Sequence, residues 1–233
     1  ASELREVRGN SVAEKSTARE YVLNRWVRLS DDGRVVILLN KSEMGQGVST
    51  ALPQIVSGEM DADWDLVSFE FAPAEEGYND PAIGAMETGG STSVRDMLEE
   101  MKKAGASARG KILKAASSVL GVPLSELRTE NGRVIHGDRS LSYGELAELA
   151  SVQEEGEYEM RDLRTKELRR KDLESKVNGR AVFGIDVSVP GMVYATVIRA
   201  PAYGADLVSY KGTEGKAVRI SDGIGVYAGS IEE

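Results

Sequence analysis

Residues 40–54 read Asn-Lys-Ser-Glu-Met-Gly-Gln-Gly-Val-Ser-Thr-Ala-Leu-Pro-Gln and join an apolar run, Val35 to Leu39, to a segment whose apolar residues have helical spacing. A strand that breaks at glycine and restarts as a helix leaves backbone N–H groups unpaired, and these suit an anionic or very polar ligand. Gly45, Gln46 and Gly47 lie at this junction. Spacing alone does not separate a ligand loop from an ordinary turn, because glycine is first of all a turn residue.

Length and composition indicate an ordinary globular protein of one large or two small domains. The chain has 233 residues, of which 41% are hydrophobic and 29% charged, as in typical globular domains. No apolar run approaches the ~20 residues of a membrane-spanning helix, so we predict no membrane span. No signal-peptide pattern opens the chain, and a processed exported protein would look the same. Periplasmic and cytoplasmic locations therefore both stay open.

Charge and residue usage exclude several kinds of chemistry. The net charge of −9, from 38 acidic and 29 basic residues, argues against nucleic acid as a partner. The absence of cysteine excludes disulfides, thiol nucleophiles and iron–sulfur ligation in this chain. A catalytic triad or His-rich metal site would need His136, the single histidine, for which we expect a structural role on a short strand. A bound cofactor or another chain is therefore expected to supply most of the chemistry.

Patterns along the chain predict an α+β (α/β) fold in four parts. Residues 1–22 are polar and indicate an N-terminal arm, residues 23–150 alternate strands and helices, residues 151–175 form a charge-dense linker or surface strap, and residues 176–233 are β-rich. We predict strands at 26–30, 34–39, 66–71, 133–136, 181–183, 192–198, 217–220 and 224–227, and helices at 49–60, 94–120 and 146–150. Ser49 or Thr50 is the expected cap of the first helix.

A second polar segment follows a long irregular stretch, residues 72–90. Loops of this length are uncommon in compact domains unless they are functional. The stretch runs into Thr-Gly-Gly-Ser-Thr-Ser at residues 88–93, and we predict that the longest helix begins there, with a possible bend at Gly105 and Gly110. Hydroxyl groups at a helix N-terminus favour phosphate. Plain N-capping is the alternative explanation for these hydroxyls.

Three ordered segments give the chain a family resemblance. Residues 41–54 closely resemble the Glu-Met-Gly-Gln-Gly motif of the molybdenum hydroxylases, the xanthine dehydrogenase and aldehyde oxidase family. Residues 89–95 look like the family's Gly/Ser/Thr turn, and residues 176–195 resemble the segment that opens its hammerhead domain, with Arg-Ala-Pro at 199–201 where the family has Arg-Ser-Pro. This order is similar to that of large subunits of the isoquinoline 1-oxidoreductase β type. The resemblance covers residues 23–230.

The resemblance implies a partial molybdopterin-binding domain followed by a partial β-rich hammerhead domain. It implies a molybdenum-pyranopterin cofactor, often the molybdopterin cytosine dinucleotide, shared with residues outside this chain. The family hydroxylates an N-heterocycle or an aldehyde with oxygen from water, and iron–sulfur clusters on a partner subunit usually receive the electrons. The expected partners are therefore the remainder of the large subunit, an iron–sulfur subunit and a small-molecule substrate.

Carried over onto this sequence, the resemblance assigns the cofactor contacts to two short segments. Gly45, Gln46 and Gly47 should contact the pterin, and the turn of Gly90, Ser91, Thr92 and Ser93 should contact the pterin or pyrophosphate. Glycines allow close approach, and an amide matches the pterin's hydrogen-bonding edge.

The family's catalytic elements do not match any segment here. Its catalytic glutamate and its Gly-rich loop near the metal lie downstream of the hammerhead, so no catalytic and no metal-binding residue is assigned in this chain. Gly144-Glu145 is explained by a helix-capping box with Ser142, and Glu43 is expected to support its loop. Two other functions stay open: a non-catalytic assembly module with this fold, and an unrelated nucleotide- or phosphate-binding α/β domain. The latter ranks lower because neither common Gly-rich phosphate motif follows a strand.

Overall fold

The computed structural model describes residues 17–156, 158–161, 168–202, 204–211, 215–220 and 223–230. The chain divides into two compact units, residues 1–181 and residues 182–233. Most of the predicted N-terminal arm lies outside the described residues.

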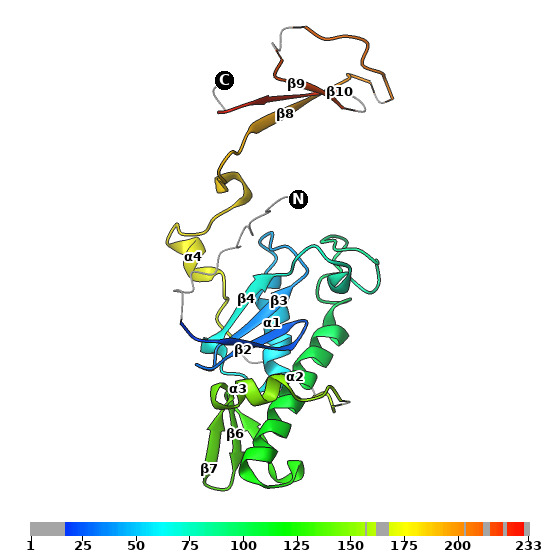
Figure 1. The fold of residues 1–233 in the computed structure, drawn as a ribbon. Helices are drawn as coiled ribbons and strands as arrows, with labels where there is room; N and C mark the ends of the chain where they lie inside the picture. The colour runs from blue at the N-terminus through cyan, green and yellow to red at the C-terminus, as the bar shows by residue number, and fades with distance from the viewer. Residues whose placement is uncertain are drawn as a thin grey trace. The chain divides into compact units, whose positions relative to one another are not determined.

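A four-stranded sheet organises the first unit. Its strands, in spatial order, are β1 (Glu20–Asn24), β2 (Val27–Ser30), β3 (Val35–Leu39) and β4 (Val67–Phe71). The predicted hairpin between β2 and β3 is confirmed, and β4 pairs in parallel with β3 after the crossover helix α1 (Val48–Met60) (Figure 1). β1 corrects the prediction of a polar arm over residues 1–22, because it begins at Glu20 and pairs with β2.

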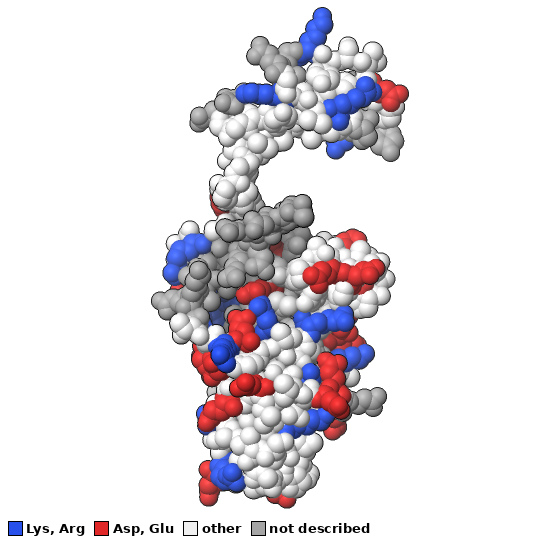
Figure 2. Space-filling model, viewed as in Figure 1, with Lys and Arg blue, Asp and Glu red and all other residues white. Residues whose placement is uncertain are grey.

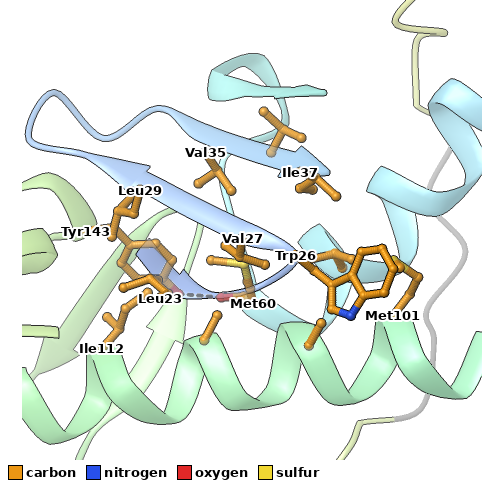
Figure 3. Packing of buried hydrophobic residues seen from close by; sticks show 14 of the residues in the cluster. Leu23, Trp26, Val27, Leu29, Val35, Ile37, Met60, Met101, Ile112 and Tyr143 are labelled. Atoms are coloured by element: carbon orange, nitrogen blue, oxygen red, sulfur yellow. Dashed lines mark hydrogen bonds between the residues drawn. The ribbon is translucent and has the colours of Figure 1, made fainter. Parts of the chain in front are cut away.

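The hydrophobic core lies between this sheet and helices α1, α2 (Leu98–Leu120) and α3 (Tyr143–Ser151). Figure 3 shows side chains of β1, β2 and β3 directed at Met101 and Ile112 of α2. Tyr143 is buried among them and its hydroxyl donates a hydrogen bond to the Met60 carbonyl. Burial raises the pKa of this hydroxyl, so Tyr143 stays neutral and closes the C-terminal end of α1.

Helix α2 differs from its prediction in two ways. It begins at Leu98 rather than directly after Ser93, and it runs unbroken through Gly105 and Gly110. A Cβ at Gly105 would lie 2.6 Å from the Val56 carbonyl oxygen of α1, and one at Gly110 would lie 2.0 Å from the Tyr158 ring. Both glycines therefore allow close packing against α2 instead of bending it.

A smaller antiparallel sheet follows α2. It consists of β5 (Arg128–Glu130), β6 (Arg133–His136) and β7 (Arg139–Ser142), after a 3₁₀ turn at Leu124–Glu126. The ring of His136 lies at its surface, with Nε2 3.0 Å from Glu126 Oε2. No group of three or more potential metal ligands exists among the described residues.

The predicted capping box at the start of α3 is confirmed. The Ser142 hydroxyl accepts from the Glu145 N–H, and the Glu145 carboxylate accepts from the Ser142 N–H at 2.7 Å. The carboxylate also accepts from the Ser142 hydroxyl at 2.7 Å. This bond first, and then the bond from the Ser142 N–H, lower the pKa of Glu145, so their contribution is present above the ordinary carboxyl range and is lost as the pH falls through the lowered value.

We expect Ser142→Ala to lower the free energy of unfolding by about 1 kcal/mol, because an N-cap acceptor is lost. Ser151→Ala is the control: its hydroxyl lies at the exposed end of the same helix, and surface changes usually stay within about 0.5 kcal/mol. Urea unfolding midpoints measure both. Equal midpoints for the two variants would contradict the capping role.

The described parts of the charged connector belong to the first unit and bond to its helices α1 and α2. The Arg161 N–H donates to both carboxylate oxygens of Glu59 at 3.1 and 3.0 Å, and Arg109 reaches the Glu59 and Glu159 carbonyls. Further along, helix α4 (Leu173–Val177) precedes the end of the unit. These contacts favour the surface-bound alternative over a solvated linker for the described parts of the connector.

The second unit contains a three-stranded antiparallel sheet. Its order is β8 (Tyr194–Arg199), β10 (Gly223–Ala228) and β9 (Ala217–Ile220). These strands match three of the predicted ones. The strand predicted at 181–183 does not form, and a 3₁₀ turn at Gly184–Asp186 follows this stretch.

Figure 2 shows acidic and basic side chains interspersed over the visible face of the first unit. Within the described part of the chain, no helix has the length and apolar character needed to cross a membrane.

Candidate functional site

Two loops that the sequence singled out separately lie together. The first loop (residues 41–47) joins β3 to α1, and the second loop (residues 87–93) precedes α2. The Ser42 N–H donates to the Thr88 hydroxyl at 2.8 Å, and the Lys41 ammonium donates to the Glu87 carbonyl at 2.8 Å. The structure therefore assembles one surface from segments 46 residues apart in sequence.

A buried ion pair fixes this junction. The ammonium of Lys41 pairs with the carboxylate of Asp80, and both side chains are fully buried. Burial would raise the pKa of Asp80, but the Lys41 hydrogen bond and backbone N–H donors, including that of Ala82 at 2.9 Å, hold it below its usual range. The irregular stretch of residues 72–90 is thus tied to the end of β3.

Glu43 organises the first loop from within. Its carboxylate accepts from the N–H groups of Gly45, Gly47 and Ser49 at 2.8, 3.1 and 2.9 Å, and from the Ser49 hydroxyl at 2.7 Å. Burial opposes ionisation, yet these bonds outweigh it and lower the pKa of Glu43. The N-cap of α1 is Gly47, at φ 88°. The expectation of a Ser49 or Thr50 cap is therefore wrong, because Glu43 satisfies the helix N-terminus.

Gln46 closes the same loop while leaving hydrogen-bonding capacity free. Its Oε1 accepts from the Met44 N–H at 2.6 Å, and its Nε2 donates to the Ser42 carbonyl at 2.8 Å. A carboxamide has two donors and two lone pairs, so one of each remains. Gly45 is exposed at φ 98°, and a Cβ there would meet nothing within 4 Å.

The second loop has four hydroxyl side chains, two of which form hydrogen bonds, those of Thr88 and Thr92. Thr92 is buried and its hydroxyl donates to the Gly89 carbonyl at 2.8 Å. Within the described ranges, the hydroxyls of Ser91 and Ser93 form no hydrogen bond, and Ser91 is exposed with φ 57°. Gly90 and Ser91 thus form a left-handed turn, and the predicted placement of residues 91–93 at a helix start is wrong because α2 begins at Leu98.

Charged residues at the end of the connector and directly after it reach the first loop. Arg170 and Lys176 lie 3.9 and 3.7 Å from Glu43 Oε1, and both also pair with Asp172. The Arg170 guanidinium, with Lys176 adding and burial opposing, lowers the pKa of Asp172 to about 2. Sequence reasoning did not assign these residues to the site. A charge-dense connector has no spacing that singles out Arg170 or Asp172, and Lys176 only opens the segment that resembles the start of the hammerhead domain.

Comparison with known proteins identifies the family. A model of the molybdopterin cofactor-binding domain matches residues 8–190, most of the chain. The chain belongs to this family. It is a molybdopterin-binding domain of a molybdenum hydroxylase-type protein, with the mixed α+β architecture predicted.

Curated relatives agree with this assignment. The beta subunit of isoquinoline 1-oxidoreductase from Brevundimonas diminuta is 34% identical, over 78% of this chain and 29% of the relative. A membrane-bound aldehyde dehydrogenase [pyrroloquinoline-quinone] of Gluconacetobacter polyoxogenes is 30% identical, over 83% and 26%. One subunit of nicotinate dehydrogenase from Pseudomonas putida is 30% identical, over 87% and 17%. The chain therefore spans less than a third of the length of each of these relatives.

The match to a solved structure of a Cu,Mo-CO dehydrogenase covers 52% of this chain and 15% of the solved chain, with 23% identity and a TM-score of 0.42. The family assignment rests on the family model and the curated relatives.

Proposed function

We propose that the two loops together hold the pterin and pyrophosphate of a molybdenum cofactor. The observation that carries the proposal is the hydrogen bond between Ser42 and Thr88, which joins the loop that contains Gly45–Gly47 to the loop that contains Ser91 and Ser93. A pterin presents alternating donors and acceptors, and a phosphate needs donors. The unused donor and acceptor of Gln46, open space at Gly45 and two free hydroxyls fit both.

Each loop has its own role in this proposal. Gly45, Gln46 and Gly47 contact the pterin, with Gln46 held rigidly by Met44 and Ser42. Gly90, Ser91 and Ser93 contact the pyrophosphate of a cytosine dinucleotide form. Thr92 holds the turn that presents them, because its hydroxyl and its N–H both donate to the Gly89 carbonyl, at 2.8 and 3.2 Å. Such preorganised groups orient a ligand at a low entropy cost.

The proposed parent reaction hydroxylates an N-heterocycle or an aldehyde with water-derived oxygen, and the cofactor supplies the molybdenum for it. The residues of this chain bind and orient the cofactor. The catalytic glutamate and the remaining cofactor contacts belong to the rest of the large subunit, and an iron–sulfur subunit accepts the electrons. Two of the curated relatives are subunits by name, which supports an assembly of this kind.

Exchange of Gln46 for alanine tests the proposal in the full-length protein that carries this chain, purified with its partners. We expect Gln46→Ala to weaken cofactor binding by about 1–3 kcal/mol, because the ligand groups facing the amide lose their partner. Molybdenum and released cytosine nucleotide per protein, measured after extended dialysis, should fall severalfold.

Gln153→Ala is the matched control, since Gln153 also bonds back to its own segment, at the Leu149 carbonyl, but lies after α3. Equal molybdenum and nucleotide contents in wild type and Gln46→Ala would refute the assignment of Gln46. If wild type and both variants assemble normally with their partners but contain no molybdenum, the result would instead favour the non-catalytic assembly module.

A further inference from the structure

Residues 168–177, the end of the connector and the two residues that follow it, are anchored beside the first loop. We call this segment the strap. The Trp64 indole N–H donates to the Arg169 carbonyl at 3.1 Å, and the Lys171 N–H donates to the Thr50 hydroxyl at 3.0 Å. The Lys171 ammonium lies 4.1 Å from the centre of the Trp64 ring and bonds to the Trp64 carbonyl. The residues on both sides of Arg170 are therefore held against α1 and the turn that follows it.

Arg170 is oriented by a pairing within the strap. Its Nε and Nη2 donate to the two carboxylate oxygens of Asp172 at 2.9 and 2.8 Å, a bidentate geometry that fixes the guanidinium plane. This places the guanidinium beside the first loop. A Cβ at Gly47 would lie 3.8 Å from its central carbon, and Glu43 Oε1 lies 3.9 Å from Nη2.

Lys176 completes a balanced cluster of four charges. Its ammonium bonds to Asp172 and lies 3.7 Å from Glu43 Oε1. The side chains of Glu43 and Asp172 are only 12% and 8% exposed, so the charges interact more strongly than they would in bulk water. The two cations therefore favour the orientation in which the Glu43 carboxylate receives the N–H groups of Gly45, Gly47 and Ser49.

We infer that Arg170 and Lys176 are positioning residues for the Gly45–Gly47 loop, acting through the carboxylate of Glu43. They hold that carboxylate in the place from which it sets the loop backbone and the N-terminus of α1. The inference rests on the proposed function insofar as the loop's ligand is the cofactor. The loop geometry itself is measurable whether or not a cofactor binds.

Amide hydrogen exchange measures this loop geometry directly, because the N–H groups of Gly45, Gly47 and Ser49 donate to the Glu43 carboxylate. In the full-length protein, Arg170→Met combined with Lys176→Met should accelerate exchange at these three amides about 5- to 30-fold. Exchange in α2 should not change. The charge-preserving pair Arg170→Lys and Lys176→Arg should restore the protection.

The control is Arg180→Met. It removes an exposed ion pair to Glu174 of α4, the helix that contains Lys176, and leaves the contacts of Glu43 in place. Lys176→Met alone leaves the Arg170–Asp172 pair intact and should give a smaller acceleration at the same amides. The inference is overturned if the double Met variant, or Lys176→Met where the double variant does not fold, exchanges like wild type. It is also overturned if Arg180→Met accelerates the three amides equally.

Cofactor content of the same samples separates the two hypotheses. Faster loop exchange with undiminished molybdenum and nucleotide would retain the positioning role and refute the loop as a cofactor contact. The opposite outcome is that Gln46→Ala loses cofactor while the double Met variant exchanges its loop amides like wild type. That outcome would retain the proposed function and refute the positioning role.

Discussion

Lys41→Met is expected to lower the free energy of unfolding by about 3–5 kcal/mol, the usual cost of removing one partner of a buried ion pair. The Asp80 carboxylate would stay fully buried without its counter-charge, and the Glu87 carbonyl would lose a donor. Urea unfolding of the chain, followed by tryptophan fluorescence, measures the effect. Both tryptophans, Trp26 and Trp64, lie in the first unit.

The double variant Lys41→Met with Asp80→Leu separates loss of the pair from loss of one charge. Replacing both partners by apolar residues of similar volume is often close to neutral, so most of the lost stability should return. Arg128→Met is the surface control, because its pairing with Glu130 is 65% exposed on both sides and such pairs contribute about 0–1 kcal/mol. A loss in Lys41→Met no larger than in this control would contradict the buried pairing.

The pH dependence of the same pair has a defined sign. Because the folded-state pKa of Asp80 is lowered, its stabilisation is present above the unfolded value of about 3.9 and is lost as the pH falls through the folded value. The free energy of unfolding of wild type should therefore fall relative to that of the double variant only below about pH 4.

Local patterns predicted much of the first unit because they depend on neighbouring residues. The Asp-Gly turn between β2 and β3, the Ser142–Glu145 capping box and the helix after Gly47 all follow from short-range chemistry. The start of α2 did not, because Ser91 takes a left-handed conformation and the Thr92 hydroxyl turns back to Gly89. A run of hydroxyl residues suits a helix cap and a tight turn equally well.

The candidate site depended on contacts that no short-range pattern encodes. The motif at residues 45–47 identified one loop and the family, which the family model confirms. This loop is joined to the second loop by the Ser42–Thr88 bond. The strap is bound nearby through Lys171 and Thr50, which are 121 residues apart in sequence. A single sequence predicts which residues are polar and where the backbone turns, whereas the packing of the whole unit decides which turns meet.

Gly105→Ala is expected to destabilise the first unit, although alanine is the better helix former. A Cβ at this position would lie 2.6 Å from both the Val56 carbonyl oxygen and the Glu59 Cβ. The contact with backbone cannot be relieved by rotating a side chain, so α1 and α2 must separate. Overpacking of this kind costs about 1–3 kcal/mol, which exceeds or offsets the gain of about 1 kcal/mol in helix propensity.

Gly58→Ala gives the opposite sign and serves as the matched control. Gly58 is exposed in the interior of α1, and a Cβ there would meet nothing within 4 Å, so only the propensity gain of about 0.5–1 kcal/mol remains. Unfolding midpoints of the two variants should therefore fall on opposite sides of wild type. Stabilisation by both substitutions would mean that the α1–α2 contact tolerates a methyl group, and Gly105 would then be only a weak point in α2.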